Sequence, residues 1–362
     1  MIRDLCAPTV GFDGARLFFA CDRSCDATVR LLGAETDLIE VSAHPLTEVD
    51  GEFLCSPSVT GLMGDTEYLV EVRAPSDPRS RLQVRTLPKP SGRHLLRFGV
   101  LADTHCSLSR LGDPGPRLFA DSLALTGKYL KKLADLGADF VVLPGDVTDS
   151  GSEAEIGAVR RIIENVEIPC RLMVGNHERE PEAFLEAFCL GDGFYSFDFR
   201  GIHFVCLRTF SPLDLNPADK QFAWLRDDLA DHRESPTVLF SHYALRDPPH
   251  LPQDSSRAIA SQGAVRALLS RNPQVRVAMA GHKNTPSVFR EDHVTHVLCP
   301  QIVQYHAGFD VVDIYEDLFV RQIHPIDELD LQRRSYHRHK QKDRPVRFGR
   351  PEDRSFAIPL SP

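Results

Sequence analysis

Long apolar stretches are absent from this chain, and their absence limits where it can act. None of the 362 residues belongs to a segment that is long and apolar enough to span a bilayer. The N-terminal residues Met1 to Cys6 do not lead into the apolar core that a secretory signal requires. We therefore expect a soluble protein without a membrane partner.

Paired cysteines are also missing. The nine cysteines include no Cys-X-X-Cys motif, and the nearest pair, Cys21 and Cys25, has no second pair to match it. An odd number of scattered thiols fits a reducing compartment better than a disulfide framework or a zinc knuckle. We therefore predict a cytoplasmic location.

The chain has no excess of positive charge. Its 42 Lys and Arg residues face 51 Asp and Glu residues, which gives a formal net charge of −9. A nucleic-acid surface needs a broad basic patch with interleaved aromatic residues, so we do not expect nucleic acid as a partner. A local basic patch remains compatible with this balance.

The first part of the chain has the pattern of an all-β domain. Short segments of β character are separated by turn residues, and they cover residues 16–20, 27–32, 37–41, 52–59, 66–73 and 81–86. Tyr68, Val70 and Val72 share one face by their period of two. The segment from Leu62 to Tyr68 resembles the tyrosine corner of fibronectin type III domains. We predict a fibronectin type III-like sandwich over residues 1–87, without a catalytic cluster.

A linker with two prolines, residues 88–94, separates this part from a region where strands and helices alternate. Strands are predicted at 96–102, 140–143, 170–174, 194–199, 202–207, 237–240, 275–280, 294–299, 309–315 and 318–323. Helices are predicted from 117 onward and at 156–166, 181–188, 217–230 and 256–270. This order indicates a layered α/β domain with a mixed sheet over residues 95–328.

The remaining segment, residues 329–362, is poor in apolar residues and rich in basic ones. Such a tail could be an arm that contacts an anionic substrate or a neighbouring subunit. It could also be solvated and partly disordered, and this is the prediction that the composition favours.

Polar clusters follow the apolar strands of the second region. They are Asp103-Thr104-His105, Gly145-Asp146-Val147-Thr148-Asp149, Gly175-Asn176-His177-Glu178, Ser241-His242 and Gly281-His282-Lys283-Asn284. Singly they are weak signals, since Asp often caps a turn or helix and a lone His is often a structural residue. Together they place Asp, Asn and His at the edge where α/β sheets bind ligands. Burying so many polar groups is costly unless divalent metal ions pair with them.

This ordered set resembles the calcineurin-like metallophosphoesterase superfamily, whose motifs read DxH, GDxxD or GDxxN, GNHD or GNHE, a lone His, and GHxH. Four blocks match, whereas the fifth ends in Asn284 where the family has His. The resemblance covers residues 95–323. The N-terminal β region and the segment from Gln221 to Leu225 look most like the purple acid phosphatase branch. The fold implied for this region is a β-sandwich flanked by helices, with a metal pair at one edge.

The resemblance implies a metal ligand at each of seven positions. These are Asp103, His105, Asp146, Asn176, His242, His282 and Asn284. Asp146 would bridge two divalent or trivalent ions. The first ion would also be held by Asp103, His105 and Asn284, and the second by Asn176, His242 and His282. Oxygen and imidazole ligands together suit manganese, iron or zinc.

Two further residues would act on the substrate. By the resemblance, His177 stabilises the phosphoryl transition state or protonates the leaving oxygen, and Glu178 orients it. Asp149 would fix the orientation of a metal ligand without binding the metal itself, or it would cap the following helix. Arg208 could contact phosphate or form a surface salt bridge.

The predicted function is therefore hydrolysis of a small phosphomonoester or phosphodiester by a metal-bridging hydroxide. Leaving-group recognition would come from loops 106–116 and 210–217. A nuclease is a second enzyme class, which the acidic balance disfavours. An interaction scaffold with a decayed metal site is the non-enzyme alternative, and Asn284 supports it. Asn284 could bind the first ion through its amide oxygen or a water, or His293 or His306 could complete that site.

Overall fold

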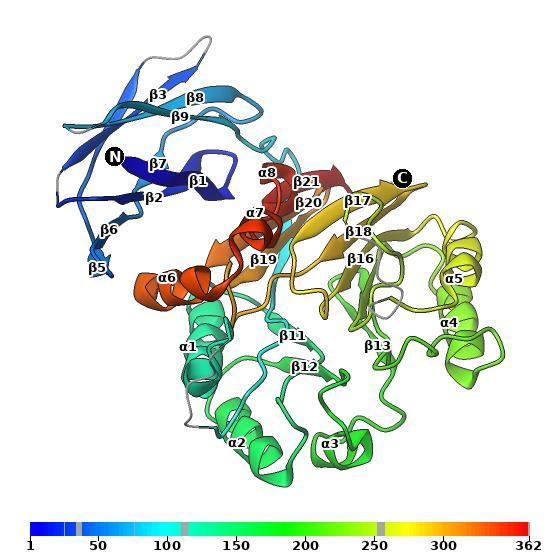
Figure 1. Cartoon of the computed structure of the whole chain (residues 1–362). Helices are drawn as coiled ribbons and strands as arrows, with labels where there is room; N and C mark the ends of the chain where they lie inside the picture. Colours follow the sequence, from blue (N-terminus) through cyan, green and yellow to red (C-terminus); the bar gives the residue numbers. More distant parts are fainter. Residues whose placement is uncertain (25, 34–37, 76, 110–114, 252–257, 361–362) are drawn as a thin grey trace.

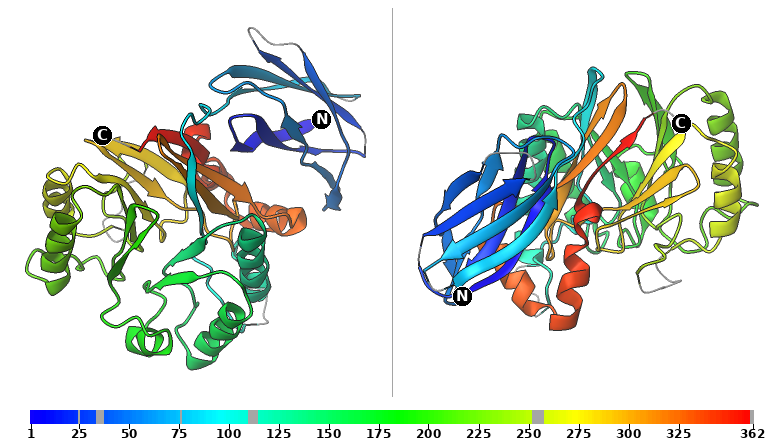
Figure 2. Two further views of the ribbon diagram at one scale, coloured as in Figure 1. Left: turned by 180° about the vertical axis from the view of Figure 1, so that it is seen from behind. Right: turned by 90° about the horizontal axis from the view of Figure 1, so that it is seen from above.

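The computed structural model describes residues 1–24, 26–33, 38–75, 77–109, 115–251 and 258–360 (Figure 1). Cys25 and part of the predicted loop 106–116 lie outside these residues. The described chain forms an N-terminal pair of small sheets and a larger pair of sheets flanked by helices (Figure 2).

The N-terminal sheets are antiparallel and face each other. The strands are β1 (Ile2–Val10), β2 (Gly14–Cys21), β3 (Ala27–Gly33), β4 (Ile39–Ala43), β5 (Thr47–Val49), β6 (Glu52–Cys55), β7 (Ser58–Thr60), β8 (Glu67–Ala74) and β9 (Asp77–Arg85). One sheet has the order β1-β2-β6-β5 with β7 on β2, and the other has the order β4-β3-β8-β9. Alternate residues such as Leu17, Val29 and Val70 are fully buried between them, as a half-buried strand requires.

The strands of this region differ from the sequence prediction in two ways. The sequence analysis did not identify β1 and β5, and the predicted strand 52–59 is divided into β6 and β7. The break falls at Ser56 and Pro57, where proline has no amide hydrogen to continue a ladder. An all-β region before the linker is confirmed.

The larger sheets form a second sandwich. The first has the order β12-β11-β10-β19-β20-β21 and the second the order β13-β14-β15-β16-β18-β17. Their strands are β10 (His94–Val100), β11 (Phe140–Pro144), β12 (Cys170–Met173), β13 (Tyr195–Phe199), β14 (Ile202–Cys206), β15 (Thr237–Ser241), β16 (Val275–Ala280), β17 (Ser287–Glu291), β18 (Val294–Leu298), β19 (Gly308–Tyr315), β20 (Leu318–Pro325) and β21 (Ser355–Pro359). Phe98, Phe140, Phe204 and Phe240 fill the space between the sheets.

Helices cover both outer faces of this sandwich. They are α1 (Ser122–Asp135), which follows the short helix η1 (Phe119–Asp121), α2 (Glu153–Glu164), α3 (Pro181–Ala187), α4 (Lys220–Asp231) and α5 (Gln262–Leu269). Apolar stripes on α1, α2 and α3 pack on the first sheet, and those of α4 and α5 pack on the second. Phe140 and Val142 face the inner core while Val141 and Leu143 face the helices, so β11 is buried on both sides. The predicted β-sandwich flanked by helices is confirmed.

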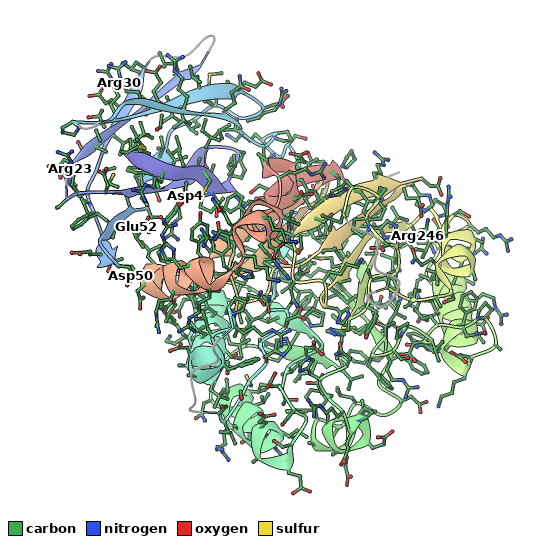
Figure 3. The ribbon with its side chains drawn as sticks, in the orientation of Figure 1. Asp4, Arg23, Arg30, Asp50, Glu52 and Arg246 are labelled. Carbon is green, nitrogen blue, oxygen red and sulfur yellow. The ribbon has the colours of Figure 1, made fainter. Side chains whose placement is uncertain are left out.

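The prediction of a solvated, partly disordered tail is wrong. Residues 329–359 fold as α6 (Leu329–Arg338), η3 (Gln341–Asp343), α7 (Arg344–Phe348), α8 (Pro351–Arg354) and β21, which pairs with β20. The Arg333 side chain is only 4% exposed, because its guanidinium donates to Asp4 at 2.7 Å and to Glu52 at 2.5 Å. Figure 3 shows Asp4 and Glu52 on the part of the N-terminal sheets that faces α6. Buried arginines and strand pairing therefore replace the apolar periodicity that the tail lacks.

Candidate metal centre

The predicted ligands come together at the carboxyl ends of five strands. β10 leads to Asp103 and His105, β11 to Asp146, β12 to Asn176, β15 to His242, and β16 to His282 and Asn284. The strands come from both large sheets, so the site lies where the two sheets of the sandwich meet at one edge.

Asp146 lies at the centre of this group. Its Oδ1 is 3.1 Å from Nε2 of His242, and its Oδ2 is 3.7 Å from Nε2 of His105. Asn176 Oδ1 is 3.0 Å from the same nitrogen of His242. The carboxylate therefore faces ligand candidates from both sides of the site.

Among the described residues, four sets of side chains have the spacing of a metal site, and two of these sets share Asp146. One set is Asp103, His105 and Asp146, and the other is Asp146, His242 and His282. Within each set the potential ligand atoms lie within 4.8 Å of one another. A carboxylate common to two adjacent sets is the arrangement that a bridging ligand needs.

The backbone at these positions is strained. Five of the candidate ligands have a positive φ between 39° and 62°, namely Asp103, His105, Asp146, His282 and Asn284. A side chain other than glycine adopts this region at a cost, and such residues gather at functional sites. The surrounding structure therefore holds these side chains in place against local preference.

Glycines permit the close approach of the loops. A Cβ on Gly175 would lie 2.3 Å from Oδ1 of Asp146, and one on Gly281 would lie 2.6 Å from Oδ2 of Asp103. Both distances are well below a normal contact, so these positions leave no room for a side chain beside the carboxylates.

The centre concentrates charge in a buried place. Burial and the neighbouring Asp146 raise the pKa of Asp103 to about 7, although His242 opposes this. Burial also opposes ionisation of Asp146, but His242 and His105 lower its pKa. Burial disfavours a charged His242, yet the Asp146 and Asp103 carboxylates raise its pKa to about 9. Metal cations at this position would stabilise the ionised carboxylates of Asp103 and Asp146, and they would take over this role from protonated histidine.

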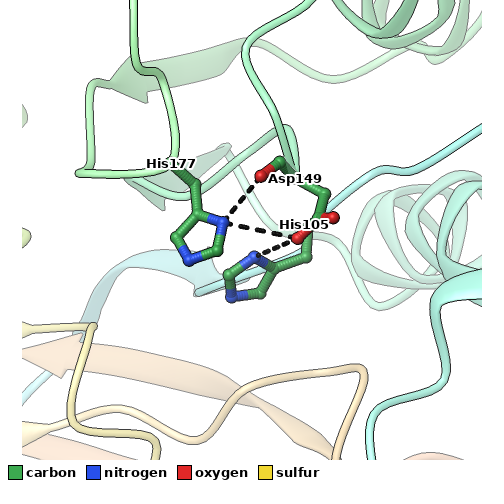
Figure 4. A group of neighbouring side chains, drawn as sticks. All are labelled: His105, Asp149 and His177. Atoms are coloured by element: carbon green, nitrogen blue, oxygen red, sulfur yellow. Dashed lines mark hydrogen bonds and ion pairs between the residues drawn. The ribbon is translucent and has the colours of Figure 1, made fainter. Parts of the chain in front are cut away.

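His177 and Asp149 form a separate contact beside the ligands (Figure 4). His177 Nδ1 lies 2.7 Å from the backbone oxygen of Asp149 and 3.3 Å from its Oδ1. Asp149 Oδ1 is also 3.4 Å from Nδ1 of His105. Asp149 thus faces a predicted ligand and a predicted catalytic residue. The predicted alternative, a cap for α2, is not found, because Ser152 accepts the hydrogen bond from Glu155 that caps this helix.

Glu178 does not orient His177, which corrects the sequence prediction. Its carboxylate is buried and accepts hydrogen bonds from the amides of Asp146 at 3.1 Å, Thr148 at 2.8 Å and Gly175 at 2.7 Å. These donors belong to the two loops that follow β11 and β12. Glu178 therefore connects the loops, while Asp149 contacts the ring of His177.

Asn284 is buried, and no donor among the described residues bonds to its Oδ1. An orphaned amide oxygen of this kind fits a cation. The two histidines considered as substitutes have other partners: His293 Nε2 is 3.1 Å from the oxygen of Asn272, and His306 Nδ1 is 3.2 Å from Arg354.

The sequence analysis missed Arg347, which holds the Asn284 loop. Its Nη1 donates to the backbone oxygen of Asn284 at 2.8 Å. Arg347 belongs to α7 and carries no motif, so the sequence offers no signal for this contact. Arg208, which was predicted to contact phosphate or to form a surface salt bridge, lies over the ring of Phe210 at 5.5 Å from its centroid.

The site and the fold together define a metal-dependent phosphoesterase. The family model of the calcineurin-like phosphoesterases matches residues 96–286. The chain belongs to this family, and the resemblance stated from the sequence is confirmed.

Two curated proteins resemble this chain. A probable cyclic nucleotide phosphodiesterase from Synechococcus is 26% identical over 205 residues, which cover 52% of this chain and 77% of that protein. Purple acid phosphatase 23 from Arabidopsis thaliana is 27% identical over 203 residues, or 48% of this chain and 43% of that protein. The match therefore spans less than half of the length of the plant enzyme.

Solved structures share the fold. A dimetal phosphatase from Danio rerio aligns with a TM-score of 0.55 at 17% identity, over 64% of this chain and 97% of that one. The purple acid phosphatase PPD1 from yellow lupin aligns with a TM-score of 0.50 at 14% identity, over 96% of this chain and 72% of that one. Among the helices that the structure describes, none has the length and apolar character needed to cross a bilayer.

Proposed function

We propose that this chain hydrolyses a small phosphomonoester or phosphodiester at the centre built around Asp146. The observation that carries the proposal is the carboxylate of Asp146, which two adjacent sets of potential ligands share. The curated relatives are named for a phosphodiesterase and a phosphatase, so both ester classes enter the proposal.

Each of the seven residues has a place in this proposal. Asp103, His105 and Asn284 would hold one ion, Asn176, His242 and His282 would hold the other, and Asp146 would contact both. When bound, two such ions supply a hydroxide at neutral pH and offset the charge of the phosphoryl oxygens. The mixture of carboxylate, amide and imidazole ligands suits manganese, iron or zinc.

Three other residues would position the ligands and protonate the leaving oxygen. His177 turns Nδ1 toward Asp149, so its Nε2 is the atom that would give a proton to the leaving oxygen. The same Asp149 faces His105 and would keep that ligand in its orientation. Glu178 would maintain the distance between the two ligand loops through their amides.

The N-terminal sheets are proposed to be a fibronectin type III-like domain over residues 1–87, followed by a linker at 88–94 and the catalytic domain at 95–328. The backbone amide of Met63 donates to the hydroxyl of Tyr68 at 2.8 Å, which supports a tyrosine corner. The scattered cysteines of the sequence support a cytoplasmic location.

Metal analysis and hydrolysis of two chromogenic esters test the function. The full chain is loaded with manganese, iron or zinc, dialysed, and assayed with p-nitrophenyl phosphate and bis(p-nitrophenyl) phosphate. We expect about two ions per chain under saturating conditions and turnover of at least one ester. Asp146→Ala should remove metal from both positions and abolish turnover.

The matched control is Asp198→Ala. Asp198, His203 and His232 also have the spacing of a metal site, but they belong to the region of β13, β14 and α4. This variant should keep the metal and the activity of the centre. Loss of bound metal in the Asp198 variant, with none lost in the Asp146 variant, would contradict the assignment. A chain that binds no metal at all would favour the scaffold.

A further inference from the structure

A half-buried arginine lies beside the candidate centre, outside every motif that the sequence analysis used. Arg117 precedes η1, and its guanidinium lies over the ring of Phe119, 5.6 Å from the centroid. The ring of Phe119 meets the ring of His105 edge-on, with 6.1 Å between centroids. Phe119 therefore places the cation near the side of the centre that His105 occupies.

The charge of Arg117 reaches several groups of the centre. It opposes the rise in the pKa values of Asp103 and His177, and it contributes to the lowered pKa of His105, which burial dominates. The rings of His105 and His177 are themselves only 4.4 Å apart. The guanidinium thus acts on the edge of the site where His177 would meet the leaving oxygen.

This cation has no carboxylate partner among the residues that the structure describes, where it contacts the ring of Phe119. Arg208, which also lies over a phenylalanine, differs because its charge helps to stabilise the carboxylate of Asp214. A half-buried guanidinium without an anion keeps five N–H donors available in a planar fork. That geometry matches two oxygens of a phosphoryl group.

We propose that Arg117 binds the phosphoryl oxygens of the substrate and is a specificity residue for anionic esters. The ligand class is a phosphate monoester dianion or a phosphodiester monoanion. The inference rests on the proposed function, because it needs the reacting phosphoryl group to lie between Asp146 and His177. Phe119 is then a positioning residue that holds the guanidinium by its ring face.

Two constants test the role of Arg117. They are the inhibition constant of inorganic phosphate and the KM for a chromogenic ester. Arg117→Ala should raise both constants by about 10–100-fold, because it removes a charge-assisted hydrogen bond that is present in the ground state. Arg117→Lys keeps the charge but loses the fork, so its constants should fall between those of the wild type and the alanine variant. Metal content and melting temperature should stay at the wild-type values.

The control is Arg160→Ala, which removes one positive charge from an exposed ion pair with Glu164 on α2. It should leave both constants unchanged. Phosphate inhibition and KM in Arg117→Ala within about twofold of the wild type would overturn the inference. Loss of metal in that variant would overturn it as well, because the arginine would then support the centre and not the substrate. A wild-type chain without turnover would overturn the inference together with the proposed function.

Discussion

At the scale of single residues, His177 has two separable contacts. Its backbone amide donates to Oδ1 of Asp146 at 2.9 Å, whereas its ring bonds to Asp149. His177→Ala keeps the first contact and removes the second. We expect kcat to fall by roughly 10²–10⁴ while bound metal stays unchanged, because proton transfer acts only in the transition state. Steady-state kinetics with elemental analysis of the same sample would check this.

Unchanged turnover in His177→Ala would show that the leaving oxygen takes its proton from elsewhere. A fall in bound metal would instead show that the ring supports the ligands through Asp149 and His105. Asp149→Asn separates these cases, since it weakens the contact with both rings and leaves His177 in place.

Asn284 is the one departure from the family motif, and it predicts a labile first ion. A side-chain amide oxygen is a weaker donor than imidazole for zinc, iron or manganese. Asn284→His should tighten binding of that ion, and Asn284→Ala should weaken it further. Metal titration of the three proteins, followed by calorimetry, measures the difference. Coinciding curves would exclude Asn284 as a ligand.

Residue order along the chain revealed the ligand candidates, but not every contact among them. The strand ends identified seven positions because residue type and order both matched a pattern. The hydrogen-bond partners of the Glu178 side chain could not be predicted in the same way, because the side chains of adjacent residues need not contact each other. Arg117 and Arg347 belong to no motif, and only the folded chain brings them to the site.

At the scale of elements, His203 on β14 predicts a pH-dependent stability. Its Nδ1 lies 2.8 Å from Asp198 and its Nε2 lies 2.9 Å from Asp228, while His232 stacks on its ring at 3.7 Å. Burial opposes protonation, but the Asp228 and Asp198 carboxylates outweigh it and raise the pKa of His203. Both ring nitrogens then donate, and this requires the charged form.

The raised pKa of His203 determines the sign of the pH dependence of stability. The stabilisation is complete below the unfolded-state pKa of about 6.5 and is lost as the pH rises through the folded-state pKa. The loss in unfolding free energy caused by His203→Gln should therefore shrink between pH 6 and pH 9, by at most about 1.4 kcal/mol per pH unit. Urea denaturation at several pH values measures it.

His296 on β18 is the control of opposite sign. Burial lowers its pKa to about 4, so its charged form destabilises the native state at low pH. The effect of His296→Gln should change below pH 6.5 and stay constant between pH 7 and pH 9. The same slope in both variants would show that neither imidazole accounts for the pH dependence.

Whether an element could be predicted from the sequence depends on how that element is stabilised. The stripes of α1 and α2 and the apolar runs of β10 and β11 reach the core directly, so composition and period reveal them. Helices α6, α7 and α8 have few apolar residues and are held by arginine contacts instead. Arg354, for example, donates to the oxygens of Pro8 and Phe348, and no local pattern encodes such partners.

At the scale of the whole molecule, the N-terminal sheets and the C-terminal segment depend on each other. A chain that begins at Pro90 loses Asp4 and Glu52, the two carboxylates that hold Arg333. The same truncation uncovers Leu329 of α6, which is buried against Ala20, Val49 and Leu54, so the helix loses its ion pairs and its apolar contact together. We therefore expect a large loss of stability in this chain but retention of the ligands, all of which lie beyond residue 95. Denaturation and metal analysis measure the two separately.

Arg333→Met distinguishes the cause. It should destabilise the full chain, because it leaves two carboxylates unpaired, and it should have little effect on the shortened chain, where Arg333 has already lost both partners. A loss of equal size in both chains would show that Arg333 acts through packing alone. If the folded shortened chain binds metal but hydrolyses nothing, the N-terminal sheets contribute to substrate binding.

The contact between Arg354 and Pro8 also sets an order of events during synthesis. The two residues are 346 positions apart. At a translation rate of about 5–20 residues per second, Pro8 is made roughly 20–70 s before Arg354. The free edge of β20 stays open for a much shorter time, roughly 2–8 s at the same rate, because its residues Leu318 and Gln322 pair with Pro359 and Ser355 of β21. A nascent chain of this protein therefore presents this unfinished sheet edge only briefly, whereas a message truncated near codon 344 would leave it exposed permanently.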